Sequence, residues 1–492
     1  MTKLKKTLSL ILSLLMVGGS LAACATAPED PAQTAGVTTE AVSEGESTIK
    51  DNLPDDLDLQ GTTITIFSDH DTLIGPDELS GDPVSDALFE RNKFVESRLN
   101  MEIAVEAFDG KGDAYAATHK MATLVQSGST EYDAIVSSCY TILDQLLSGT
   151  FADLANAAYL DLPQPWWSQD FNRSLSFRDS QYTLAGHILV SIYRSAYATV
   201  FNQNRFIDAR QPFPYEYVEN GTWTLDKQIS LVPLFHQDTN GDGQQDPNDY
   251  YGLVTAHHSK MDPYWASCEV DIVGKTSDGE FELIFDSGEA HEMAEKVLFL
   301  LYETDNSVYL EPAYDPASVF AKGTSAMATI TLGSLESTQF RDMEDIYGVV
   351  PMPRFSEDQD AYYSTLHDGF SVFAVPTTIQ GDRLDTVAAV LEAMASASYN
   401  IVKPVYYETT LRTKLVNDPQ SSEMMDMVVN NLLSDPGYFF VDAMRGFRQG
   451  LRDILISGQN TTVSYYATRS KIDKKSIQQI NKKLERLADR NQ

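Results

Sequence analysis

Short strand-like segments alternate with helix-like segments near the start of the globular part, and this alternation constrains the fold most. Residues 62–67 are β-branched and alternate in polarity, and residues 101–105 and 132–136 have similar strand composition. Residues 86–100 and 115–125 lie between them and space apolar side chains as a helix does. Strands that alternate with helices predict a mostly parallel sheet flanked by helices, with ligand sites beyond the carboxyl ends of the strands.

Polar residues follow the first and third of these strands. Asp69 follows the first strand, and Ser138 and Tyr140 follow the third. Because carboxyl ends of parallel strands meet at one edge of a sheet, we expect these side chains to lie near one another and near a ligand.

The N-terminus carries a signal for export. Lys3, Lys5 and Lys6 precede an apolar run over residues 8–17, which is too short for a permanent membrane span. Leu-Ala-Ala-Cys24 follows and resembles a bacterial lipoprotein signal, with residues 1–23 removed and Cys24 lipidated. The alternative is an ordinary signal peptide with a chance cysteine. Residues 24–57 have few large apolar groups, which predicts a disordered tether.

Size and charge limit the remaining possibilities. A chain of 492 residues exceeds what one core usually holds, so two lobes are expected. The 36 Lys and Arg against 71 Asp and Glu give a formal net charge of −35, which excludes nucleic acid as a partner. Cys139 and Cys268 are compatible with one disulfide or with two thiols.

An acidic loop at residues 238–249 has the spacing of a calcium-binding loop. Oxygen donors stand at positions 1, 3, 5, 7, 9 and 12 of the loop, and a glycine stands at position 6. This spacing suits a hard cation, which needs six or seven oxygens turned inward. The expected ligands are Asp238, Asn240, Asp242, Gln244 (through its carbonyl), Asp246 and Asp249. An aspartate at position 12 predicts weaker or water-assisted coordination. The alternative is a solvated acidic turn.

The same stretch carries a resemblance to a known family. A Thr-Trp-x-Leu segment around Trp223, the acidic loop and then Tyr251-Gly-Leu resemble family 1 extracellular solute-binding proteins, the capture subunits of ABC importers. Residues 347–353 also resemble a segment of that family, and the resemblance covers residues 60–440 in scattered blocks. It implies a two-lobed α/β fold with a three-crossing hinge, a sugar or oligosaccharide ligand and permease partners.

The resemblance also implies a division of the chain. Lobe 1 is expected to comprise residues 58–190 and 330–372, and lobe 2 residues 191–329 and 373–492. The first hinge crossing is expected at residues 188–195 and the third at residues 368–376.

Aromatic side chains are candidates for the sugar site, because sugars present apolar C–H faces to flat rings. Two adjacent tryptophans, Trp166 and Trp167, cannot both face one core from a regular element, so one is expected to reach a cleft or a lobe interface. For each aromatic residue, burial in the core is the alternative. The complete predicted ligand set is Asp69, Ser138, Tyr140, Trp167, Tyr193, Trp265, Asp368 and Tyr406.

Motifs of catalysis are missing from the sequence. It contains no G-x-S-x-G, Walker loop, H-E-x-x-H or glycine-rich dinucleotide turn. Together with the aromatic residues and the lipoprotein-like signal, the resemblance to solute-binding proteins therefore implies a monomeric, non-enzymatic sugar receptor, attached to the extracellular face of the cell membrane through its lipid alone. The alternatives are a secreted, calcium-stabilised polysaccharide hydrolase, or the same fold binding a peptide or another polar solute.

Overall fold

The computed structural model describes residues 49–412 and 419–489. The predicted signal peptide, the lipidation site at Cys24 and the tether up to residue 48 lie outside the described residues. Among the described helices, none combines the length and the hydrophobicity that crossing a membrane requires.

The first sheet contains the strands expected from the alternating segments. Its order is β11-β3-β1-β2, with β1 parallel to β2 and β3 and antiparallel β11 at the edge. The strands are β1 (Thr62–Ser68), β2 (Met101–Ala107), β3 (Ala134–Ser138) and β11 (Ser371–Ala374). All three predicted strands and their parallel arrangement are confirmed.

The second sheet has the order β10-β4-β9-β5-β8, in which β4 is antiparallel to both neighbours and β5 is parallel to β8 and β9. Its strands are β4 (Tyr197–Asn202), β5 (Tyr251–Ala256), β8 (Val308–Glu311), β9 (Ser325–Thr331) and β10 (Tyr347–Val350). A separate antiparallel pair joins β6 (Val273–Lys275) to β7 (Phe281–Leu283).

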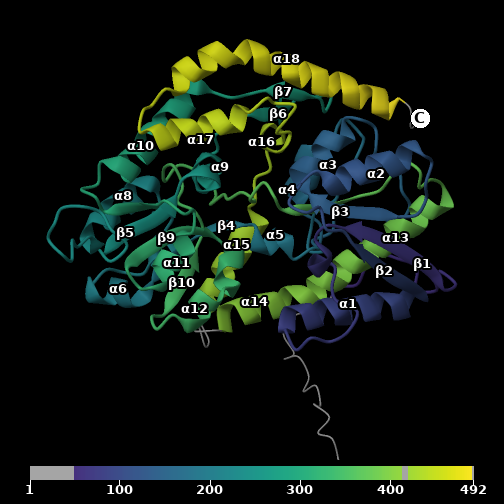
Figure 1. The fold of residues 1–492 in the computed structure, drawn as a ribbon, viewed down its shortest axis with the longest axis horizontal. Coiled ribbons are helices and arrows are strands. Elements are labelled where there is room, and N and C mark those ends of the chain that lie inside the picture. The colour runs from purple at the N-terminus through teal and green to yellow at the C-terminus, as the bar shows by residue number, and fades with distance from the viewer. Residues whose placement is uncertain (1–48, 413–418, 490–492) are drawn as a thin grey trace, which may run out of the picture. The chain divides into compact units, whose positions relative to one another are not determined.

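Helices surround both sheets (Figure 1). Those up to the first strand of the second sheet are α1 (Pro83–Leu99), α2 (Ala116–Gln126), α3 (Cys139–Leu146), α4 (Gln169–Leu175) and α5 (Ser191–Arg194). The next are α6 (Gln203–Asp208), α7 (Pro214–Glu219), α8 (Leu225–Leu231), α9 (Asp262–Ser267), α10 (Ser287–Tyr302), α11 (Pro316–Ala321) and α12 (Thr338–Asp342). The last are α13 (Asp382–Ala397), α14 (Lys403–Arg412), α15 (Pro419–Asn430), α16 (Pro436–Phe439), α17 (Phe447–Ser457) and α18 (Thr462–Ala488).

Local sequence signals set the ends of α1. The Asp82 side chain accepts a hydrogen bond from the Ser85 N–H at 2.9 Å, and Pro83 occupies the first turn. Asn100 ends the helix in a left-handed conformation with φ 48°. The helix therefore presents Val84, Leu88 and Val95 to the core beneath the sheet.

Residues 49–57, the last part of the predicted tether, are packed against the globular part of the chain. Leu53 is buried, and the Arg98 side chain donates a hydrogen bond to Asp51 at 2.5 Å. The Ile49 N–H donates to the Asn400 side chain. Residues 49–57 therefore pack on the helices of the first sheet. One apolar side chain and one paired carboxylate hold them there, and the composition of the segment did not reveal these contacts.

Strand pairing corrects the expected lobe boundaries. Tyr347–Val350 was expected in lobe 1, yet it pairs along β4 in the second sheet, and the chain returns to the first sheet only at β11. Residues from 373 onward were expected in lobe 2, yet α13 and α14 pack against α1. The position of β10 follows from its pairing with β4 along all four of its residues, which are also buried.

The two cysteines of the globular part are free thiols. Cys139 is buried at the start of α3, and burial raises the pKa of its thiol. The alternative of two thiols is therefore the one the structure has.

Candidate ligand-binding site

A hollow of about 510 Å³ lies at the carboxyl ends of β1 and β2. Its lining follows those two strands in sequence: Asp69, His70, Ala107, Phe108, Asp109, Gly110, Gly112, Asp113 and Ala114. The volume falls within the range of about 300–1,000 Å³ that is typical of small-molecule sites. Its position is the one that parallel-sheet topology favours for a ligand.

Asp69 offers an unused acceptor in this hollow. Its Oδ2 accepts a hydrogen bond from Ser137 Oγ at 2.7 Å, whereas its Oδ1 is buried and has no hydrogen-bond partner among the described residues. His70 Nε2 is 3.8 Å from Oδ1, and burial raises the pKa of Asp69 against the effect of His70. A buried acceptor without a donor is costly unless a ligand or water supplies the missing hydrogen bond.

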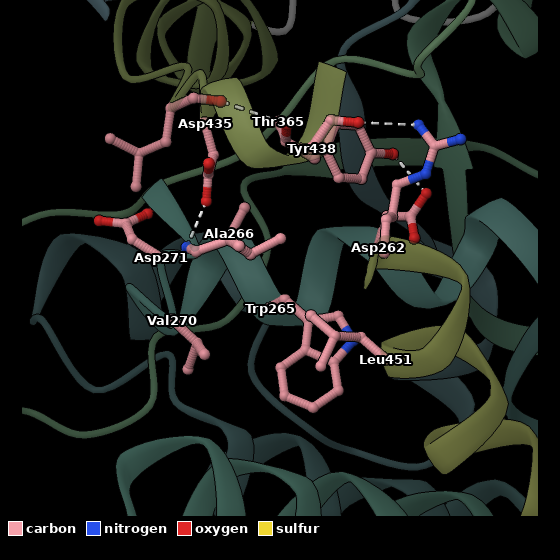
Figure 2. A pocket seen from close by; sticks show the side chains of 12 residues that line it. Asp262, Trp265, Ala266, Val270, Asp271, Thr365, Asp435, Tyr438 and Leu451 are labelled. Atoms are coloured by element: carbon pink, nitrogen blue, oxygen red, sulfur yellow. Dashed lines mark hydrogen bonds between the residues drawn. The ribbon is translucent and has the colours of Figure 1, made fainter. Parts of the chain in front are cut away.

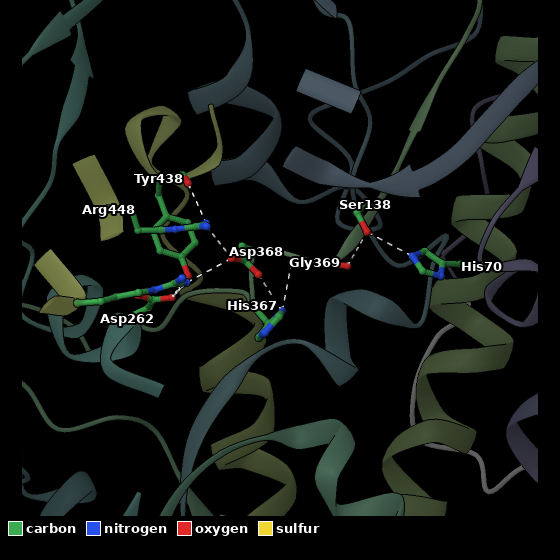
Figure 3. A network of polar contacts seen from close by, with 9 residues as sticks. His70, Ser138, Asp262, His367, Asp368, Gly369, Tyr438 and Arg448 are labelled. Atoms are coloured by element: carbon green, nitrogen blue, oxygen red, sulfur yellow. Dashed lines mark hydrogen bonds and ion pairs between the residues drawn. The ribbon is translucent and has the colours of Figure 1, made fainter. Parts of the chain in front are cut away.

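A polar chain leads from this hollow toward the second sheet (Figure 3). His70 Nε2 is 3.3 Å from Ser138 Oγ, and Ser138 Oγ donates to the Gly369 carbonyl at 3.4 Å. Gly369 and Asp368 stand in the segment that enters β11. The chain of contacts therefore joins the carboxyl ends of β1 and β3 to the start of β11.

Asp368 lies where three basic side chains converge. Arg448 Nη2 is 2.8 Å from its Oδ2, Arg452 Nη2 is 3.2 Å from the same oxygen, and His367 Nδ1 is 3.2 Å from Oδ1. Burial works to raise the pKa of Asp368, but Arg448, His367 and Arg452 together hold it below its usual range. The carboxylate is therefore ionised.

Asp262, the first residue of α9, extends the same network to the segment that follows β5 of the second sheet. Arg452 Nε donates to Asp262 Oδ1 at 2.7 Å, and the Tyr438 hydroxyl donates to Asp262 Oδ2. Both side chains of the Arg452–Asp262 pair are almost fully buried. Arg448 and Arg452 stand on α17, which packs on the short 3₁₀ helix His258–Met261 that follows β5.

A small cavity beside this network has a volume of about 30 Å³ (Figure 2). Its lining includes Asp262, Trp265, Asp271, Thr365, Asp435, Tyr438 and Leu451. The volume is sufficient for water and is far below that of a small-molecule site. The cavity is therefore too small to hold a sugar ring beside Trp265.

Lys260 adds a further cation at the carboxyl end of β5. Its Nζ is 5.3 Å from the centroid of the Tyr197 ring, and it forms no ion pair with any described residue. Burial lowers the pKa of Lys260, although Asp315 and Asp262 oppose this. A half-buried ammonium with spare donors can bind a ligand hydroxyl or carboxylate.

Four predicted ligand residues lie together. Asp69 and Ser138 are joined through His70, and Ser138 contacts the residue next to Asp368. Tyr140 is half-buried with its ring against Tyr115, and the charges of Asp368 and Asp69 add to burial in raising the pKa of its hydroxyl. This group forms because all four residues follow or precede strands of the first sheet.

Three predicted aromatic residues lie in the core. Trp167 and Trp166 are both buried, and their indole N–H groups donate to the two carboxylate oxygens of Glu392 at 2.8 and 2.9 Å. Neither tryptophan therefore reaches an open cleft, which was one of the two expected positions. Tyr193 and Tyr406 stack on each other with centroids 4.9 Å apart, and both are fully buried. Trp265 is 5% exposed at the edge of the small cavity.

Sequence reasoning missed His70, Lys260, Arg448 and Arg452. The first two follow β1 and β5, so the rule about carboxyl ends of strands could have found them had it been applied to every residue there. The two arginines stand on a helix that precedes neither a strand nor a motif, and only the fold brings them to Asp368.

The predicted calcium loop connects the 3₁₀ helix Val232–Phe235 to β5. The Asp238 carboxylate accepts hydrogen bonds from the Gly241 and Gly243 N–H groups at 2.6 and 2.8 Å, which lower its pKa. Gly243 at position 6 has φ 71°, the sharp turn that the sequence required.

The fit of this loop to calcium is partial. Asn240 and Asp242 turn their oxygens back to N–H groups of the loop, and Asp249 is 1% exposed with its Oδ1 accepting from the Thr239 N–H at 2.9 Å. Across the described residues, no three Asp, Glu, His or Cys side chains are gathered as metal ligands. The backbone has the shape of a cation loop, while the side-chain oxygens are engaged with the loop itself.

Comparisons by sequence find no matching family model and no similar curated protein. Solved structures are similar in fold across most of the chain. ABC substrate-binding protein Lmo0181 from Listeria monocytogenes, in complex with cycloalternan, has a TM-score of 0.52 at 16% identity and covers 86% of this chain and 99% of its own. UgpB from Mycobacterium tuberculosis, in complex with glycerophosphocholine, has a TM-score of 0.52 at 17% identity, with coverage of 87% and 99%.

The cyclic α-maltosyl-1,6-maltose binding protein from Arthrobacter globiformis has a TM-score of 0.56 at 13% identity, covering 86% of this chain and 99% of its own. Identities this low establish the fold and leave the ligand open. The predicted α/β architecture is confirmed: this chain has the two-lobed fold of substrate-binding proteins of ABC transporters.

Proposed function

We propose that this protein is an extracellular receptor that binds a sugar or oligosaccharide between its two lobes and delivers it to an ABC permease. The unpartnered Asp69 Oδ1 at the edge of a 510 Å³ hollow carries the proposal. A sugar hydroxyl is the donor that this oxygen lacks, and burial makes the hydrogen bond worth more than it is in water. The sugar-binding structures with the same fold favour this ligand class.

Closure of the lobes follows from the network at Asp368. Asp368 belongs to the segment that enters the first sheet, and its partners Arg448 and Arg452 stand on a helix packed beside the second. These ion pairs form in the closed arrangement, and a ligand with hydroxyls for Asp69 and Lys260 adds contacts that favour it further. The ligand leaves intact, because no bond is made or broken.

Titration of Trp265 fluorescence tests the ligand class. Trp265 borders the small cavity of about 30 Å³, whereas Trp166, Trp167 and Trp223 are fully buried. Mono- and oligosaccharides should change the emission of the wild type, and Trp265→Phe should lose the change while calorimetry still detects binding. Silence of both methods across the panel would reject a sugar receptor, and release of shorter saccharides on long incubation would favour a hydrolase.

The anchor and the ion are parts of the same proposal. Lipidation at Cys24 would keep the receptor, a monomer, at the cell membrane, and fractionation of cells expressing Cys24→Ala tests it: the variant should move from membrane to medium. Calcium in the 238–249 loop would stabilise the junction before β5. Asp238, Asn240, Asp242, Asp246 and Asp249 would supply side-chain oxygens after giving up loop hydrogen bonds, and Gln244 its carbonyl.

A further inference from the structure

A second groove, with a volume of about 550 Å³, lies beside the C-terminal helix α18 and away from the strand ends. Its wall comes from three parts of the chain: the end of α3, the segment between α16 and α17, and α18 itself (Figure 1). The lining residues are Leu147, Asp442, Ala443, Arg445, Ser476, Gln479, Ile480, Lys482, Lys483 and Arg486.

Four cationic side chains line this groove. Arg445, Lys482, Lys483 and Arg486 are exposed and form no ion pair with a described residue. In a chain with a formal net charge of −35, acidic partners are abundant, so an uncompensated basic cluster is a local exception. Lys482 and Lys483 stand four and three residues before Arg486, a spacing at which like charges destabilise a helix. A bound anion would remove that repulsion.

Ser476 is a second, independent indication of a ligand. It is 2% exposed, lines the groove, and its Oγ has no hydrogen-bond partner among the described residues. A hydroxyl can donate to an anionic oxygen, and the Gln479 amide in the same wall adds two further donors. The groove therefore offers hydrogen-bond donors as well as positive charge.

We propose that this groove binds a small soluble compound with two or more phosphate groups. Guanidinium and ammonium groups bind phosphate oxygens through charge-assisted hydrogen bonds. Four cations exceed what one singly charged group needs, which favours a multiply charged ligand. Asp442 is the single carboxylate among the lining residues, so the net charge of the lining remains positive.

Calorimetry of the full chain with sodium tripolyphosphate tests this site. The matched variants are Lys482→Gln/Lys483→Gln in the groove and Lys474→Gln/Lys475→Gln on the same helix outside its lining, since both pairs change net charge equally. The groove pair should weaken binding at least tenfold, about 1.4 kcal/mol. The outer pair should change it less than twofold, and Ser476→Ala should weaken it severalfold.

Three outcomes would overturn the proposal: no binding of tripolyphosphate at low salt, equal losses in the two lysine pairs, or binding only to vesicles of phosphatidylglycerol. Arg445→Gln, outside any helix, repeats the test if the double variant fails to fold, as judged by urea denaturation. Sugar affinity is measured in parallel, and its retention in every variant shows that this second site is separate from the first.

Discussion

Arg448 of α17 and Asp368, three residues before β11, form an ion pair with 2.8 Å between Nη2 and Oδ2. Asp368 is also bound by Arg452, which in turn holds Asp262. The two arginines thus share the Asp368 carboxylate, and only Arg452 has a second carboxylate partner. Removing the two arginines should therefore have different consequences.

Arg452→Met should lower the free energy of unfolding by about 3–5 kcal/mol, because it leaves the buried Asp262 carboxylate without its cation. Arg448→Met should cost much less, since Asp368 keeps Arg452. Urea denaturation at neutral pH measures both. Equal losses would show that the charge network does not distinguish the two arginines.

Glu392 should make stability depend on pH. Burial raises the pKa of this carboxyl to about 7 from 4.5, against the hydrogen bonds from Trp167 and Trp166. Because the folded state binds the proton more tightly, its contribution is fully present below pH 4.5 and is lost as pH rises to about 7, by up to about 3 kcal/mol. Urea denaturation from pH 5 to 8 should show stability falling with pH.

Glu392→Gln is the control for this slope. It should lower stability at every pH, since one amide oxygen cannot accept from both indoles, and it should flatten the pH dependence. An unchanged slope would assign it to other carboxyls with raised pKa, such as Asp435 (about 8) and Asp144 (about 7).

Asp69→Asn should weaken sugar affinity about tenfold or more, because an amide nitrogen replaces one of the two acceptor oxygens of a residue that lines the hollow. Asp77→Asn, an exposed residue, changes the net charge equally and should have no effect. Calorimetry with the best sugar of the panel gives both affinities. Unchanged affinity in Asp69→Asn would place the ligand elsewhere.

Removal of calcium by EGTA should lower the melting temperature and leave sugar affinity within twofold. A bound ion at a hundred times its Kd stabilises the folded state by about 2.7 kcal/mol, and the loop is separate from the hollow. Asp238→Asn/Asp242→Asn should melt lower and become insensitive to EGTA. A large loss of affinity at a temperature where the chain stays folded would tie the ion to the ligand site.

Local patterns predicted local features well. The three parallel strands of the first sheet and the turn at Gly243 depend on short-range preferences, and the structure has all of them. Asp69, Ser138 and Tyr140 were expected near one another because strand ends share an edge, and the structure places them together. Their role in ligand binding stays a prediction.

Long-range partners were beyond the same reasoning. Nothing near Trp166 and Trp167 in sequence reveals Glu392, more than two hundred residues away, which satisfies both indoles in the core. The pairing of β10 with β4 likewise depends on a strand far back in the chain. The cluster at Asp368 brings together a loop and α17. No residue spacing in the sequence indicates that these two segments are in contact.

The contacts of residues 49–57 attach the N-terminal segment to the first sheet's half of the molecule. Ile49 bonds to Asn400 in the segment after α13, which packs with α1 on the first sheet. Anything that holds the N-terminus to a surface therefore pulls on that half of the molecule alone. The half built on β4, β5 and β9 is not attached through these contacts. Its movement relative to the first half would therefore not be opposed by the N-terminal attachment.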